Sequence, residues 1–123
     1  IKKSNYLAQD YIDSDNIGAV INAADLVISR SGANTVWDLG ILAKVAICVP
    51  LPISAAGEQQ ENAKILESAG IARILDQDKC TQDKLVQEID YVFKHYASFQ
   101  KNAKNFAKTL PPDATDKVVE YLK

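Results

Sequence analysis

Short apolar runs alternate with longer amphipathic segments along the 123 residues, and this alternation restricts the fold more than any other feature. The apolar runs have the length of strands, whereas the segments between them repeat their apolar residues at helical spacing. The expected strands are residues 5–12, 25–29, 45–49 and 71–75. Because a helix follows each strand, the pattern predicts an α/β fold with a parallel sheet flanked by helices on both faces.

Helices are expected between the strands, over residues 16–24, 35–43 and 58–69. Gly70 follows the last of these in the position that usually ends a helix. One long helix is expected from Thr81 to about Lys108, with an apolar stripe made of Leu85, Ile89, Val92, Phe93 and Tyr96. Pro111 and Pro112 end it, and Asp113 can cap a short final helix whose apolar face is Val118, Val119 and Leu122.

Composition and charge exclude several classes of function. The chain has 14 Lys and Arg against 16 Asp and Glu, so it has no excess positive charge with which to bind nucleic acid. Its two cysteines lack a C-x-x-C spacing and are expected to be free thiols, which fits a reducing cytoplasm. The longest apolar run, residues 45–53, is far shorter than the roughly 20 residues that span a bilayer.

The segment SRSGANTVWDLG, residues 29–40, places small residues between a strand and a helix. Those expected at the amino end of the helix are Ser31, Gly32, Ala33, Asn34 and Thr35. Free N–H groups and the helix dipole favour a phosphate there. Asp38, one turn further, would repel phosphate but could accept hydrogen bonds from sugar hydroxyls. Taken alone, these residues favour an ordinary capping box, with Thr35 as N-cap and Asp38 as the acid.

A second polar cluster follows the strand at residues 45–49. The run GEQQENA, residues 57–63, starts a helix after a Pro and Gly loop and carries Glu58, Gln59 and Gln60. These side chains offer both donors and acceptors, which suits a ligand with several hydroxyl groups. The alternative is a solvated first turn made of good helix formers.

Groups for nucleophilic or metal catalysis are expected to lie outside this chain. The single histidine, His95, lies off the apolar stripe of its helix and is expected to be solvated. One histidine can form neither a histidine metal cluster nor, near the candidate loops, a Ser-His-Asp triad, so no metal, cofactor or catalytic base is assigned here. Trp37, the only tryptophan, is expected to pack against the fold instead of stacking on a ligand.

The motif SRSGANT, together with VPLP and the later EQ and NA pairs, resembles the MurG-like N-acetylglucosaminyltransferases, family 28 of the GT-B superfamily. The similarity lies in their carboxyl-terminal, donor-binding domain and runs from YID at residues 11–13 to PDAT at 112–115. It implies an incomplete Rossmann-like UDP-sugar-binding domain over residues 1–110 and a C-terminal crossing helix over 111–123.

The resemblance also implies roles for particular residues. Ile12 would contact uracil through its backbone, and the loop of Ser31, Gly32, Ala33, Asn34 and Thr35 would hold the diphosphate. Asp38, where the family commonly has Glu, would hold the ribose. Glu58 and Gln59 would hold the hydroxyls of the sugar.

The implied reaction is transfer of N-acetylglucosamine from UDP-N-acetylglucosamine to a lipid-linked muramyl pentapeptide, with inversion and without a metal or cofactor. The acceptor would bind a missing amino-terminal domain, so this chain alone is expected to be inactive. The full-length protein is expected at the inner face of the plasma membrane, as a peripheral protein. Three alternatives stay open: another UDP-sugar transferase with a lipid acceptor, a non-catalytic subunit of a split transferase, and a regulatory α/β module.

The strand order of the family, 3-2-1-4-5-6, predicts which strands lie at the edge of the sheet. A full domain of this type begins with a strand, a glycine-rich phosphate loop and a second strand, which are expected to be missing here. The strand at residues 5–12 would then lie two empty places from the strand at 25–29. We therefore expect an exposed or rearranged sheet edge, or a larger protein of which this chain is a portion.

Overall fold

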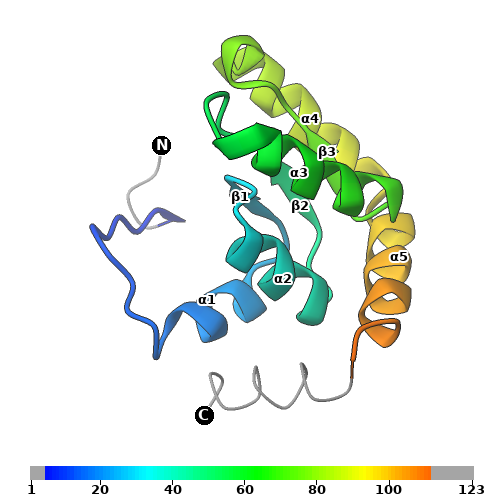
Figure 1. Cartoon of the computed structure of the whole chain (residues 1–123). Coiled ribbons are helices and arrows are strands. Elements are labelled where there is room, and N and C mark those ends of the chain that lie inside the picture. Colours follow the sequence, from blue (N-terminus) through cyan, green and yellow to red (C-terminus); the bar gives the residue numbers. More distant parts are fainter. Residues whose placement is uncertain (1–4, 112–123) are drawn as a thin grey trace.

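The computed structural model describes residues 5–111, which form a three-stranded parallel sheet with helices on both sides (Figure 1). The strands are β1 (Val27–Ser29), β2 (Ala46–Cys48) and β3 (Ala72–Ile74), and they lie side by side in that order. Val27 pairs with Ala46, and Ala46 pairs with Ala72. This arrangement confirms the predicted α/β fold class and three of the four expected strands.

The helices alternate with these strands as the sequence predicts. They are α1 (Ile17–Ala23), α2 (Ala33–Ile41), α3 (Glu58–Ser68), α4 (Gln82–Lys94) and α5 (Tyr96–Lys108). Two short 3₁₀ turns, Ala55–Gly57 and Gln77–Lys79, precede α3 and α4. None of the helices within residues 5–111 is long and apolar enough to cross a membrane.

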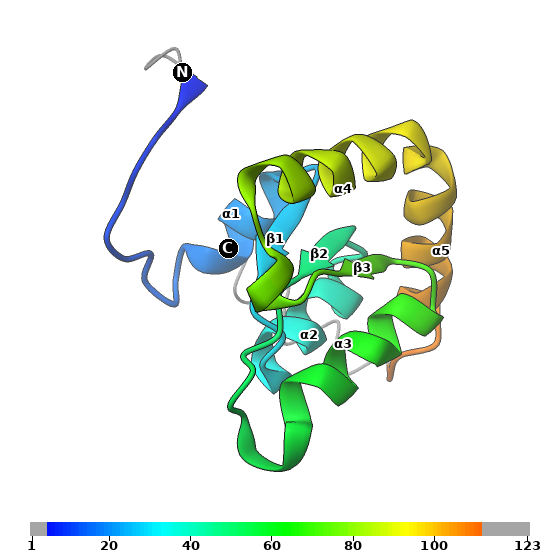
Figure 2. The same ribbon diagram turned by 90° about the horizontal axis from the view of Figure 1, so that it is seen from above.

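The core has two parts, one on each face of the sheet, because successive side chains of a strand point to opposite sides. Cys48 of β2 belongs to a buried cluster with Leu39 of α2 and Leu66 of α3. Ile47, the residue before it, belongs to a second cluster with Val92 of α4. Helices α2 and α3 therefore cover one face and α4 covers the other (Figure 2), as predicted.

The expected strand at residues 5–12 is wrong. These residues form no strand, and Tyr6, Leu7 and Tyr11 are 66%, 83% and 80% exposed. Figures 1 and 2 both show this segment, in blue, apart from the sheet. An apolar run becomes a strand only where another strand offers hydrogen bonds, and within the described residues β1 pairs with β2 alone. The free edge of β1 agrees with the exposed sheet edge that the family strand order predicts.

The expected single helix from Thr81 to Lys108 is also wrong, because it breaks at His95. The backbone of His95 lies at φ −114° and ψ 23°, outside helical values, and its carbonyl begins the next helix by accepting from the N–H of Phe99. The break turns α5 across the edge of the sheet, so that Phe99 packs in one core cluster and Ala103 in the other. His95 is exposed as expected, whereas Phe93 of the predicted stripe is 50% exposed and stacks on Tyr96.

The predicted end of α3 at Gly70 is confirmed in detail. Gly70 has a φ of +77°, and its N–H donates to the Glu67 carbonyl at 2.9 Å. The N–H of Ile71 donates to the Leu66 carbonyl at 3.0 Å. This pair of bonds is a Schellman motif, which needs a left-handed residue at the position that glycine fills.

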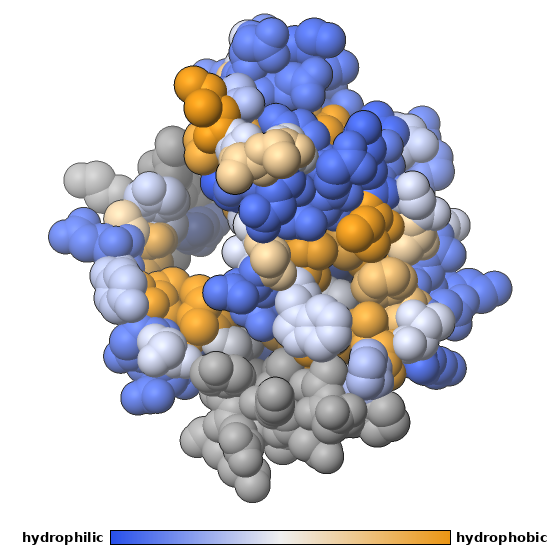
Figure 3. Space-filling model, in the orientation of Figure 1, coloured by the Kyte–Doolittle hydropathy of each residue, from blue (hydrophilic) through white to orange (hydrophobic). Residues whose placement is uncertain are grey.

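Trp37 lies on α2 at an apolar groove and is 46% exposed. The groove has a volume of about 290 Å³ and is also lined by Ile65 of α3 and Phe106 of α5. Figure 3 shows apolar residues (orange) gathered next to the polar outer surface of α3, in the region between α3, α2 and α5. Trp37 thus borders the groove and is not part of the buried core. The expected final helix lies outside the described residues.

Candidate functional site

The amino end of α2 leaves its first N–H groups without partners in the helix. The helix begins at Ala33, and Gly32 is the N-cap, with extended backbone and no side-chain capping bond. The first intrahelical bond runs from the N–H of Val36 to the Gly32 carbonyl at 3.0 Å. The N–H groups of Ala33, Asn34 and Thr35 therefore face out of the helix end, where the dipole favours an anion.

The start of α2 also decides between the two interpretations of Thr35. A capping box requires Thr35 to be the N-cap, but the helix begins two residues before it. The capping alternative is therefore wrong, because Gly32 fills that position and has no side chain. Thr35 and Asp38 lie inside the helix, in its first and second turns.

Asp38 lies one turn beyond Asn34, on the same side of α2, because residues four apart share a helix face. Its side chain is half-buried, and desolvation by burial raises the pKa of the carboxyl. Within residues 5–111, no hydrogen bond or ion pair reaches this carboxylate. It is thus an acceptor available to a group outside the protein.

The loop between β2 and α3, residues 49–57, is held in place by the first residues of α3. The side-chain oxygen of Gln59 accepts from the N–H of Leu51 at 2.8 Å, and the Ser54 hydroxyl accepts from the N–H of Gln59 at 3.2 Å. Gln60 donates to the Leu51 carbonyl at 3.1 Å. Gln60 therefore supports the loop, whereas the NH₂ group of Gln59 and the exposed carboxylate of Glu58 have no partner within residues 5–111.

The residues predicted on the two loops meet in the structure. The Ser31 hydroxyl donates to the Gln59 carbonyl at 2.7 Å, and the amide of Asn62 donates to the Ser31 carbonyl at 3.1 Å. A Cβ placed on Gly32 would lie 4.0 Å from Nε2 of Gln59. The start of α2 and the start of α3 thus form one continuous polar surface at the carboxyl edge of the sheet.

Sequence reasoning missed two residues that hold this surface together. Arg30 donates from Nη1 to the carbonyls of Val49 and Pro50, at 3.2 and 3.4 Å, and so ties the end of β1 to the end of β2. Asn62 binds the backbone of Ser31 from the second turn of α3. Both residues lie within the motifs of the resemblance, Arg30 in SRSGANT and Asn62 in the NA pair, but the sequence alone assigned no role to either.

Ile12 is not brought to this surface. It is half-buried, in the segment that Figures 1 and 2 draw away from β1, α2 and α3. Just after it, the Asp13 side chain accepts from the N–H of Asn16 at 3.0 Å and starts the approach to α1. The expected contact of Ile12 with uracil stays a prediction.

A hollow of about 380 Å³ lies beside the loop between β2 and α3. It is lined by Pro50, Pro52 and Gln60, and by Asp76, Gln77 and Asp78 from the turn after β3. The sequence analysis did not point to this turn. Within residues 5–111, no three His, Cys, Asp or Glu side chains form a group that could hold a metal ion.

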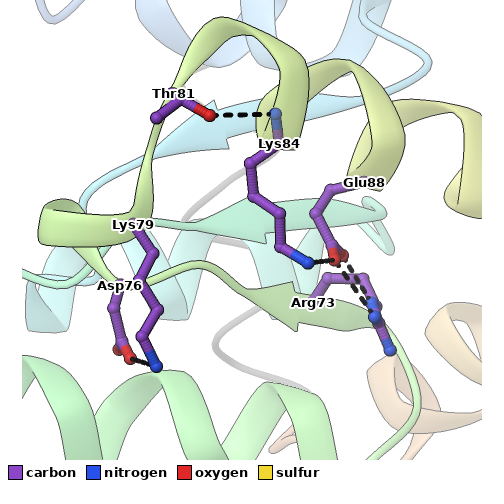
Figure 4. A network of polar contacts seen from close by, with 6 residues as sticks. All are labelled: Arg73, Asp76, Lys79, Thr81, Lys84 and Glu88. Atoms are coloured by element: carbon purple, nitrogen blue, oxygen red, sulfur yellow. Dashed lines mark hydrogen bonds and ion pairs between the residues drawn. The ribbon is translucent and has the colours of Figure 1, made fainter.

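The opposite face carries a charged network on β3 and α4 (Figure 4). Glu88 accepts from Arg73 at 2.7 and 3.2 Å, and the Arg73 guanidinium lies 4.2 Å from the centre of the Tyr91 ring. The hydrogen bond from Arg73 outweighs the effect of burial and lowers the pKa of Glu88. Both charges are paired, so this network supports the packing of α4 and offers no free group to a ligand.

Comparison with known proteins shows the family to which this fold belongs. A sequence model described as the glycosyltransferase family 28 C-terminal domain matches residues 2–118. The chain belongs to this family. The family resemblance carried by the SRSGANT and EQ motifs is thereby confirmed.

Curated family 28 members similar to this chain are named UDP-N-acetylglucosamine–N-acetylmuramyl-(pentapeptide) pyrophosphoryl-undecaprenol N-acetylglucosamine transferase. The protein from Oenococcus oeni is 31% identical over 99% of the chain, and that from Bacillus cytotoxicus is 36% identical over 88%. The chain spans only about a third of their length, 32% and 30% respectively. The family relation therefore covers one domain of these larger proteins.

Solved structures agree with the family assignment. MurG from Acinetobacter baumannii superimposes with a TM-score of 0.64 and 33% identity, over 80% of this chain and 28% of that protein. A glycosyltransferase of kitacinnamycin superimposes with a TM-score of 0.67 over 92% of this chain and 26% of its own. Its identity is 16%, so this second match supports the fold alone.

Proposed function

We propose that this family 28 domain is the donor-binding part of an inverting glycosyltransferase that uses UDP-N-acetylglucosamine. In the complete protein, the sugar would pass to a lipid-linked muramyl pentapeptide during peptidoglycan synthesis. The proposal draws on the names of the curated relatives and on the two loops described above. The chain itself would supply donor binding and no catalytic base.

The observation that carries the proposal is the uncapped amino end of α2 beside the side chain of Gln59. The N–H groups of Ala33, Asn34 and Thr35 would bind the diphosphate, which favours a helix N-terminus. The Asp38 carboxylate would accept from the ribose hydroxyls. Glu58 and Gln59 would bind the sugar hydroxyls, and the hydrogen bond from Ser31 to the Gln59 carbonyl sets their distance from α2.

The chemistry follows from this placement. A hydroxyl of the acceptor attacks the anomeric carbon from the face opposite the diphosphate, and the bond from that carbon to the phosphate oxygen breaks. UDP leaves with the electron pair and gains negative charge, which the N–H groups of α2 would stabilise more strongly than in the bound donor. The proton of the acceptor hydroxyl passes to a base outside this chain.

The wider context of the domain belongs to the same proposal. Residues 1–110 would form the incomplete UDP-sugar-binding domain, and residues 111–123 would cross to another domain. That domain would bind the lipid acceptor, and the full-length protein would associate peripherally with the inner face of the plasma membrane. The contacts with the lipid acceptor and with the membrane would come from other parts of the full-length protein.

Calorimetric titration of the 123-residue chain tests the proposal, with UDP-N-acetylglucosamine, UDP-galactose, UDP and ADP as ligands. We expect binding of the UDP ligands, preference for UDP-N-acetylglucosamine over UDP-galactose, and at least about tenfold weaker binding of ADP. Equal affinity for ADP and UDP would contradict a uridine donor site. A preference for UDP-galactose would instead favour a different sugar donor.

A further inference from the structure

Two hydrogen bonds join the two loops through Ser31, and together they form a clip. One runs from the Ser31 hydroxyl to the Gln59 carbonyl at 2.7 Å, and the other from the Asn62 amide to the Ser31 carbonyl at 3.1 Å. We infer that this clip sets the position of the sugar-binding side chains relative to the diphosphate-binding helix end. Ser31 and Asn62 are therefore positioning residues that control preference for a UDP-sugar over UDP. The inference rests on the proposed function.

Burial separates Ser31 from the residues that could touch a ligand. Its relative exposure is 0%, and its hydroxyl donates to a backbone carbonyl. The next residue, Gly32, is the N-cap of α2, so the clip holds α3 at a fixed distance from the free N–H groups of α2. Ser31 therefore positions α3 relative to the diphosphate-binding helix end without touching a ligand.

The partner atoms lie at the other end of the proposed site. Gln59 O belongs to the first turn of α3, and Asn62 comes three residues later in the same helix. The side chain of Gln59 is fixed to the Leu51 N–H through its oxygen, so its NH₂ group faces the neighbourhood of Gly32. Because 28 residues separate Ser31 from Gln59 along the chain, their spacing depends on contacts such as these.

The expected consequence is a change in selectivity. UDP would use the α2 end, Asp38 and the expected uracil contact of Ile12, whereas UDP-N-acetylglucosamine also needs Glu58 and Gln59 at the correct distance. Loss of the clip would leave UDP binding nearly intact and weaken the additional contacts of the sugar. A residue that only stabilised the fold would weaken both ligands alike.

The test compares UDP and UDP-N-acetylglucosamine affinities in Ser31→Ala, Asn62→Ala and the double variant by calorimetric titration. Each single change should lower the ratio of sugar-nucleotide to UDP affinity by about threefold to tenfold, the range expected for one hydrogen bond. The affinity ratio of the double variant should be little lower than that of either single variant, since both hydrogen bonds hold the same two loops together. Ser29→Ala is the matched control, because the Ser29 hydroxyl bonds only the adjacent Arg30 carbonyl.

The outcomes distinguish the two claims. An unchanged ratio, or equal weakening of both ligands, in a folded Ser31→Ala or Asn62→Ala variant would overturn the clip while the donor site stands. If Ser31→Ala does not fold, Asn62→Ala and the isosteric Asn62→Asp give the same comparison from the half-buried partner. Binding of neither nucleotide by the unchanged chain would overturn the proposed function, and the clip with it.

Discussion

Helices α2 and α4 both begin at the carboxyl edge of the sheet, but only α4 closes its own amino end. At α4, the Thr81 hydroxyl accepts from the N–H of Lys84 at 3.2 Å, as Figure 4 shows. At α2, Gly32 provides no such bond, and the N–H groups of Ala33, Asn34 and Thr35 have no partner among residues 5–111. A self-capped helix start needs no ligand, whereas the start of α2 gains hydrogen bonds when an anion arrives.

Charge in the first turn separates the two helix ends further. Asp83 lies in the first turn of α4, and Glu58 and Glu61 lie in that of α3, whereas the first turn of α2 carries no acid. A diphosphate would meet repulsion from first-turn acids at α3 and α4, whereas the acid of α2, Asp38, lies one turn further along the helix. The comparison therefore supports the proposal that α2 binds the diphosphate and α3 binds uncharged hydroxyls.

The largest expected effect is on Asp38. Asp38→Ala should weaken UDP binding by about 1.5–3 kcal/mol, because charge-assisted hydrogen bonds to the ribose are lost. Asp83→Ala makes the same change at α4 and should leave the affinity unchanged. Calorimetric titration of both variants provides the comparison, and equal affinities for UDP would remove Asp38 from the site.

Giving α2 a cap like that of α4 should have the next largest effect. Gly32 has a φ of −63°, and a Cβ there meets only Gln59 Nε2 at 4.0 Å, so a side chain fits. Gly32→Asp should weaken UDP binding by about 1–2 kcal/mol through competition for the N–H groups and repulsion of the diphosphate.

Gly32→Asn adds a cap of the same shape without the charge and should lose less affinity than Gly32→Asp. Both variants should unfold at the same or a slightly higher temperature. Unchanged UDP affinity in a Gly32→Asp variant with a raised melting temperature would contradict diphosphate binding at this helix end.

The two threonines should differ in stability. Thr81→Ala removes a real cap and should lower the free energy of unfolding by about 1 kcal/mol. Thr35→Ala removes no cap and should cost less than about 0.5 kcal/mol. Urea unfolding of the two variants measures the difference, and an equal loss would show that Thr35 caps α2 after all.

The smallest expected effect is a pH dependence at Asp38. Burial raises the pKa of this carboxyl, so the folded chain holds its proton to a higher pH than the unfolded chain does. The free energy of unfolding therefore falls as pH rises from the ordinary Asp pKa, near 4, through the raised value. Asp38→Asn should thus be more stable than the unchanged chain at neutral pH and lose this advantage below about pH 4. An advantage that persists at pH 3 would exclude this titration as its cause.

Much of the fold could be predicted because it depends on local pattern. The buried run that becomes β2 and the glycine that ends α3 carry their signals within a few residues. The prediction of a strand at residues 5–12 was wrong because a strand must pair with a neighbouring strand, and the apolar content of a segment does not specify that neighbour. The break at His95 was not predicted because no Pro or Gly marks it. The position of α5 is set by packing against both core clusters.

The candidate site divides in the same way. The small residues of the motif correctly indicated the start of α2. The helix was expected to begin at Thr35, two residues after its actual start at Ala33, and a capping box was therefore still possible. The burial of Ser31 and its contact with Gln59 depend on segments 28 residues apart, which no local pattern reveals. The role of Asn62 was missed because its partner, the Ser31 carbonyl, lies 31 residues away along the chain.

The central claim is that the amino end of α2 binds the diphosphate, and an amide NMR titration with UDP tests it most directly. The largest shifts should come from the N–H signals of Gly32, Ala33, Asn34 and Thr35, with the capped N–H of Lys84 in α4 unmoved. Saturating shifts centred on α3 or α4, or no change at the α2 signals, would contradict the claim.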